Sequence, residues 1–112
     1  MADKRFIEVP GCKKTLVEEL LTEEGLQVMH VHVQPGGEIP LHRHSCAATM
    51  VVTQGYARKL GVHQDTVQKG DVVTKKPYEE HGFTEVKEPF SFISVSYGQG
   101  IMRKDGWNIN YL

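Results

Sequence analysis

The sequence predicts an all-β protein, built as a sandwich or barrel of short antiparallel strands. Short apolar runs recur at regular spacing and are divided by glycine and proline. Met29, Val31 and Val33 alternate with polar residues, which is the period of a strand buried on one face. The expected strands cover residues 5–9, 26–34, 38–46, 48–53, 56–62, 66–68, 72–74, 81–86 and 90–97.

Residues 13–24 carry conflicting signals. Thr15 and Glu18 have the spacing of a helix capping box, and four apolar residues nearby recur at helical spacing. A small barrel must nevertheless cover the edges of its sheet, and an early strand does so. We therefore expect strand or irregular structure over this segment, despite its helical spacing.

Size and charge indicate one soluble domain. The chain has 112 residues, enough for a single core, and a formal net charge of −1. It contains no basic cluster, which argues against nucleic acid or an acidic membrane surface as the main partner. The N-terminus lacks the apolar core of a signal peptide, so we expect a cytoplasmic protein with Cys12 and Cys46 as free thiols.

The first candidate for chemistry is a pair of histidines. His42 and His44 lie two residues apart on a predicted strand, so both side chains project from one face. A neutral imidazole is a general ligand for Zn, Fe, Ni and Cu, so two on one face are the beginning of a metal site. Further ligands must come from elsewhere in the chain.

The spacing around these histidines resembles the first motif of the cupins, a family of small jelly-roll barrels. That motif runs from a glycine through His-x-His and a glutamate to a second glycine. Its glycines and histidines are present at the expected spacing (Gly36, His42, His44 and Gly55). The second cupin motif begins with Gly70-Asp71 and reaches a histidine, here His81.

The resemblance covers about residues 26–97 and implies a double-stranded β-helix. It predicts one cupin domain over residues 1–112, with a barrel core at about 26–97 and a C-terminal tail at 98–112. Trp107 makes the tail too apolar for a mobile end, so we expect it to pack on the barrel or on a partner subunit.

The same resemblance implies a metal held by His42, His44 and His81. The ion would be a divalent transition metal such as Fe, Zn, Ni or Mn. Ala48 stands where the motif has its glutamate ligand. The site is therefore one negative charge poorer, which favours an anionic or bidentate oxygen-donor substrate. Cys46 shares the strand parity of His44 and is a candidate fourth ligand.

Several other residues are candidates for the site or its surroundings. Glu85 lies two strand steps beyond His81 and is a candidate catalytic base or replacement ligand. The candidate pocket-lining residues, which fit an ordinary barrel core equally well, are Met50, Tyr78, Phe83 and Phe92. His30 and His32 alternate with the apolar face, so we expect exposed histidines there rather than a second metal site.

The resulting functional expectation is a metal-dependent enzyme that acts on a small molecule. Three-histidine cupins of this kind resemble the thiol dioxygenases and the diketone-cleaving dioxygenases, and an isomerase or lyase is also open. The alternative is a non-catalytic module that binds or senses a small ligand or metal, and a weaker one is a purely structural barrel. We expect a homodimer because a small barrel leaves apolar strand faces exposed.

Overall fold

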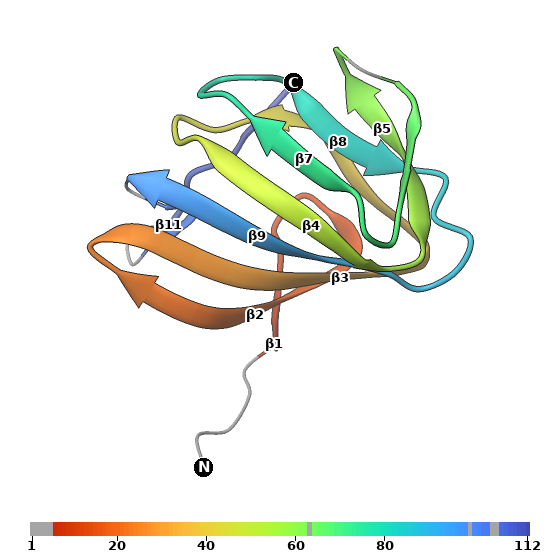
Figure 1. The fold of residues 1–112 in the computed structure, drawn as a ribbon, viewed down its shortest axis with the longest axis horizontal. Coiled ribbons are helices and arrows are strands. Elements are labelled where there is room, and N and C mark those ends of the chain that lie inside the picture. Colours follow the sequence, from red (N-terminus) through yellow and green to blue (C-terminus); the bar gives the residue numbers. More distant parts are fainter. Residues whose placement is uncertain (1–5, 63, 99, 104–105) are drawn as a thin grey trace.

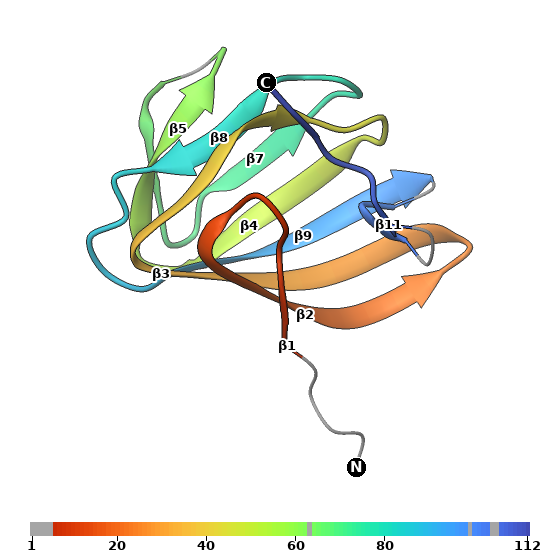
Figure 2. The same ribbon diagram turned by 180° about the vertical axis from the view of Figure 1, so that it is seen from behind.

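The computed structural model describes residues 6–62, 64–98, 100–103 and 106–112. These residues form strands, turns and bends, with no helix among them, which confirms the all-β prediction (Figure 1). A ten-stranded sheet curls into a half-barrel, and a separate two-stranded sheet, formed by β10 (Met102–Arg103) and β11 (Gly106–Trp107), packs against it (Figure 2). Within the described chain, no helix is long and apolar enough to span a membrane.

The strands have the following bounds in chain order. They are β1 (Phe6–Glu8), β2 (Lys13–Glu23), β3 (Gly25–Arg43), β4 (Ala48–Gln54), β5 (Tyr56–Gly61), β6 (Thr66–Gln68), β7 (Val72–Lys75), β8 (His81–Thr84), β9 (Phe90–Gly98), β10 (Met102–Arg103), β11 (Gly106–Trp107) and β12 (Asn110–Tyr111).

β3 is the central strand of the fold. The main path of the sheet runs β6-β5-β8-β3-β9-β4-β7, and β2 and β12 also pair with β3. The first part of β3 pairs with β2 and β9, and its last part pairs with β8 and β12. β3 therefore links β2 and β9 to β8 and β12. It carries a histidine of the candidate site near its C-terminal end.

The break expected between the predicted strands 26–34 and 38–46 is wrong, because β3 continues through residues 35–37. Pro35, Gly36 and Gly37 bend the strand instead of reversing it. Gly36 has a positive φ of 82°, which glycine adopts at little cost. A Cβ on Gly37 would lie 2.7 Å from the Lys13 carbonyl oxygen, so only glycine allows this close approach. The bend redirects the strand toward β8.

β2 forms a strand where the local sequence has helical spacing, as expected. It pairs with β1 on one side and with β3 on the other. Thr15 and Val17 face the core, whereas Leu20 and Leu21 remain exposed. Sheet pairing on both sides therefore outweighs local propensity here.

The core lies inside the half-barrel. Phe83, Phe90 and Phe92 stack at centroid separations of 5.3, 5.4 and 5.6 Å. Offset and tilted contacts at this distance are favourable for aromatic rings. The C-terminal tail packs on the barrel: β12 pairs with β3, and Trp107 is packed against the core. The tail thereby closes one side of the cavity described below.

Candidate metal centre

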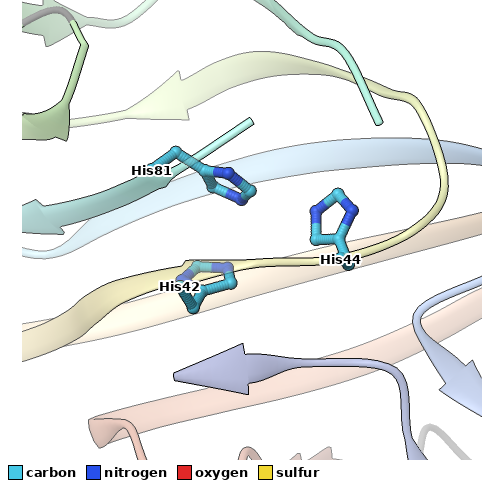
Figure 3. Close-up of side chains that lie close together, drawn as sticks. All are labelled: His42, His44 and His81. Carbon is cyan, nitrogen blue, oxygen red and sulfur yellow. The ribbon is translucent and has the colours of Figure 1, made fainter. Parts of the chain in front are cut away.

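His42, His44 and His81 converge inside the half-barrel (Figure 3). His42 lies on β3 directly opposite His81 on β8, and their ring centroids are 4.2 Å apart. His44 follows the end of β3, with its ring 4.8 Å from that of His81 and 6.0 Å from that of His42. One potential ligand atom from each ring lies within 4.8 Å of the other two. This clustering could place three imidazole ligands around one metal ion.

A backbone carbonyl fixes the tautomer of each ring. In all three histidines, Nδ1 lies 2.8 Å from a carbonyl oxygen, and the accepting residues are Pro40, Cys46 and Glu79. A carbonyl oxygen only accepts, so each Nδ1 carries the hydrogen and each Nε2 keeps a lone pair. Anchoring of one ring nitrogen by a carbonyl is typical of metal-binding histidines. The donor set therefore fits a divalent transition metal.

Burial keeps these imidazoles neutral. The pKa of His42 is lowered to about 4, mainly by burial and further by the nearby Lys75. Burial likewise lowers the pKa of His44 and of His81, and Lys75 contributes to both shifts. Since only the neutral ring coordinates a metal, all three are competent ligands at neutral pH.

Lys75 is the functional candidate that sequence reasoning missed. It ends β7 and is buried, with Nζ 5.1 Å from the Phe83 ring centroid and 5.9 Å from that of Phe92. Burial lowers the pKa of this amine to about 7. The nearby carboxylate of Glu79 raises the pKa of this amine, but its effect is smaller than that of burial. The signal in the sequence is weak, because lysines near strand ends are usually exposed.

The histidines and Lys75 share one cavity of about 60 Å³. Of the four residues named above as pocket-lining candidates, Phe83 and Phe92 line this cavity. The tail also contributes to the wall: Tyr111 pairs with His42, and their ring centroids are 5.8 Å apart. No acidic residue among those described lines the cavity.

Two of the expected pocket residues lie elsewhere. Met50 is buried in the core with 1% exposure, but it does not line the cavity. Tyr78 is 59% exposed and adopts a positive φ of 63° in the loop before β8. That backbone conformation turns the chain ahead of His81 and leaves the tyrosine at the surface.

Cys46 and Glu85 are not brought into the metal cluster. Cys46 is buried, but its Sγ lies 3.5 Å from Nδ1 of His44, the nitrogen that the backbone already anchors. Burial also raises the pKa of this thiol, which disfavours the thiolate needed for coordination. β8 ends at Thr84, and Glu85 has a positive φ of 56°, so the strand parity assumed for Glu85 is lost.

Glu85 instead forms a surface ion pair. Its Oε2 accepts a hydrogen bond from Nε of Arg58 at 2.8 Å, and the glutamate side chain is 54% exposed. The nearby guanidinium lowers the pKa of the Glu85 carboxyl. The expected role of Glu85 as a base or ligand in the cavity is therefore not supported by its position.

Comparison with known proteins identifies the fold. No profile of a known protein family matches the sequence, and no curated protein matches it. The polyketide cyclase RemF from Streptomyces resistomycificus superposes with a TM-score of 0.74 at 21% identity, covering 85% of this chain and 74% of that one. An RmlC-like cupin from Shewanella frigidimarina gives 0.77 at 16% identity, covering 91% and 87%. A variant of oxalate decarboxylase from B. subtilis gives 0.78 at 21% identity, covering 98% of this chain and 30% of that longer chain.

These likenesses define the class: the chain has the double-stranded β-helix fold of the cupins. Within that class it carries a buried three-histidine cluster that can hold a metal. Ala48 stands in place of the motif glutamate and is itself buried, with 4% exposure.

Proposed function

We propose that this protein is a metal-dependent cupin enzyme that acts on a small anionic molecule with oxygen donor atoms. The observation that carries the proposal is the cavity itself, in which His42, His44 and His81 converge beside the buried Lys75. The histidines would hold the metal, and the lysine would bind the anionic group of the substrate.

The charge of the cavity supports an anionic ligand. A divalent ion held by three neutral imidazoles keeps its full charge, and Lys75 adds positive charge when protonated. No described acidic residue lines the cavity to compensate. Buried charges are costly unless they are paired. A carboxylate or similar oxygen anion from the substrate would supply that pairing.

Each part of the cavity has a role in this proposal. A bound divalent metal would supply Lewis acidity, and iron or manganese would add redox chemistry. The backbone-anchored histidines orient the ligand nitrogens. Phe83 and Phe92 exclude water from the ligand. The amine of Lys75, with a pKa of about 7, can hold or release a proton at Nζ near neutral pH.

The reaction class that we propose is dioxygenase-like, with isomerase and lyase chemistry as the other options. The similar structures include proteins named as a polyketide cyclase and an oxalate decarboxylase, which supports the capacity of this fold for catalysis. The missing carboxylate at Ala48 leaves more than one coordination position for substrate. Bidentate oxygen donors, including diketones, fit that arrangement.

A substrate screen tests this proposal. The purified protein is loaded separately with ferrous iron, manganese, nickel or zinc and offered small thiols, diketones and hydroxy acids. Oxygen uptake and product formation are measured for wild type, His42→Ala and Lys75→Met. Turnover that both substitutions remove supports the enzyme. Turnover that persists in His42→Ala would show that the cavity is not the active site.

A non-catalytic binding or sensing module is the second candidate. No Asp or Glu among the described residues lines the cavity, so a carboxylate that could act as a general acid or base is missing there. This absence favours a module that binds without catalysis. This candidate predicts metal and anion binding without turnover for any metal in the screen. Tight binding of metal and anion, with no turnover for any metal in the screen, would support this candidate over the enzyme.

We also propose that the protein forms a homodimer in the cytoplasm. Phe6, Leu20 and Tyr97 are 53%, 49% and 48% exposed on the described part of the chain. A two-fold contact would cover the same apolar surface on both copies. Sedimentation equilibrium at micromolar concentration should give twice the chain mass of 12.6 kDa. The mass of a monomer would contradict the dimer.

A further inference from the structure

A second group of metal-ligating side chains lies on the opposite face of the sheet. Glu18 on β2 pairs directly with His30 on β3, and His32 follows two residues later on the same face. The intervening Val31 points the other way and lines the three-histidine cavity. The two clusters are therefore separated by the sheet itself.

These side chains are more buried than the alternation along the strand predicts. The side chain of Glu18 is 7% exposed, and those of His30 and His32 are 26% and 35% exposed. Phe6 covers part of the group, with its ring centroid 5.8 Å from that of His32. The carboxylate and the two imidazoles are therefore partly shielded from solvent.

The spacing of the donor atoms leaves room between them. Oε1 of Glu18 lies 3.8 Å from Nδ1 of His30 and 3.9 Å from Nε2 of His32. Both separations are too long for hydrogen bonds. The two imidazole centroids are 4.1 Å apart. Both rings lie near the same carboxylate oxygen, Oε1 of Glu18. The three donor atoms lie within 4.8 Å of one another.

The hydrogen bonding around the cluster independently points to a ligand. Nε2 of His32 is buried and has no hydrogen-bond partner, which is rare for a buried polar atom. Nε2 of His30 is 3.2 Å from Oγ1 of Thr53, and that hydroxyl is 2.7 Å from Oγ of Ser91. These contacts engage Nε2 of His30, and Nδ1 of the same ring lies on the side of the Glu18 carboxylate.

We propose that Glu18, His30 and His32 form a second divalent-metal site, on the outer face of the sheet. Two imidazoles and one carboxylate are a known zinc ligand set, with the fourth position open to water. Donors on a tetrahedral zinc ion lie about 3.4 Å apart. The observed separations of 3.8 and 3.9 Å therefore need to shorten by a few tenths of an ångström. Side-chain rotation supplies that change without moving the strands.

Removal of the first site exposes the second to measurement. In the variant His42→Ala/His81→Ala, equilibrium dialysis with Zn²⁺ should still give about one ion per chain. Adding His32→Ala or Glu18→Gln should weaken the remaining binding by at least about tenfold. Glu23→Gln is the matched control, because Glu23 is an exposed glutamate on the same strand. It should leave Zn²⁺ binding unchanged.

A second measurement does not depend on the folding of the double variant. The wild type should bind about two Zn²⁺ ions per chain, and His32→Ala alone should lower this to about one. The proposal is overturned if the His42→Ala/His81→Ala variant folds and binds no Zn²⁺. It is also overturned if Glu18→Gln and His32→Ala leave the stoichiometry and affinity of the wild type unchanged.

Discussion

Lys75 and Ala48 face each other as directly paired residues in the β7–β4 ladder. Directly opposed side chains of antiparallel strands project from the same face of the sheet. The buried amine of Lys75 therefore lies beside the position at which the cupin motif has its glutamate. Relative to that motif, this site has lost an acidic group and gained a basic one, which supports the proposed anionic ligand.

Replacement of Lys75 by methionine should weaken anion binding and, at the same time, make the metal-free protein more stable. Methionine removes the charge but keeps an unbranched side chain against Phe83 and Phe92. We expect anion binding to weaken by about tenfold or more, because a buried charged hydrogen bond is lost. The metal-free protein should become more stable by at least about 1 kcal/mol below pH 7, since a desolvated charge is removed.

Isothermal titration with small carboxylates and urea unfolding check these two effects. Lys76→Met is the matched control, because Lys76 is the exposed neighbour of Lys75. It should change neither quantity appreciably. Unchanged carboxylate binding in Lys75→Met would contradict the role given to the amine.

The substitution Ala48→Glu should restore a carboxylate beside the three histidines. The new oxygen can fill an open metal position or pair with Lys75, and both outcomes lower the positive charge of the cavity. Metal should bind at least as tightly, whereas activity that needs bidentate substrate should fall. Ala48→Gln controls for size, because Ala48 is buried and any longer side chain crowds it. Equal effects of the two substitutions on metal affinity would contradict the electrostatic explanation.

Glu85→Gln should have no effect on metal content or turnover. Its carboxylate is held by Arg58 at the surface, and pairs of this kind contribute little to stability. Metal analysis and the activity assay of the substrate screen provide the measurement. A large loss of activity would show that Glu85 reaches the cavity in solution, contrary to its position here.

The metal-free protein should lose stability as the pH falls from about 6.5 to about 4. The pKa of His42 in the folded state is about 4, below the value of about 6.5 in an unfolded chain. Between these values the unfolded chain binds a proton that the folded state does not, so acidification favours unfolding. The contribution of His42 amounts to about 3 kcal/mol.

Urea unfolding after removal of metal measures this pH dependence. The slope of stability against pH should decrease in His42→Gln, which removes the titrating group. The same lowered pKa values mean that protons compete with metal only at acidic pH, so metal should remain bound below pH 6.5. An apoprotein whose stability is unchanged between pH 7 and pH 4 would contradict the burial of neutral imidazoles.

The sequence predicted the fold well where pattern and spacing are local. Alternation at Met29, Val31 and Val33 identified a strand, and motif spacing predicted that His42, His44 and His81 lie together in one cluster that could hold a metal. Strand parity predicted that Glu85 faces the cavity, but its backbone adopts a positive φ and the alternation of side chains ends before it. No residue pattern near Glu85 predicts this change of backbone conformation.

The features that depend on register were not predictable from one sequence. Lys75 enters the cavity only because β7 pairs with β4 at Ala48, and Glu18 meets His30 only because β2 pairs with β3 in that register. Alternation shows which face a side chain occupies, but it does not show which residue of a distant strand lies opposite. The sequence predicts two strands, one on either side of Gly36, instead of one bent strand, because glycine and proline occur both in turns and in bends.

The most direct test of the central claim is to locate the metal in a crystal. Crystals grown with zinc or iron are measured at the absorption edge of that metal, and the anomalous peak is placed relative to the imidazoles. We predict a peak within about 2.0–2.3 Å of Nε2 of His42, His44 and His81. A metal-loaded crystal without a peak among these three nitrogens would contradict the three-histidine centre.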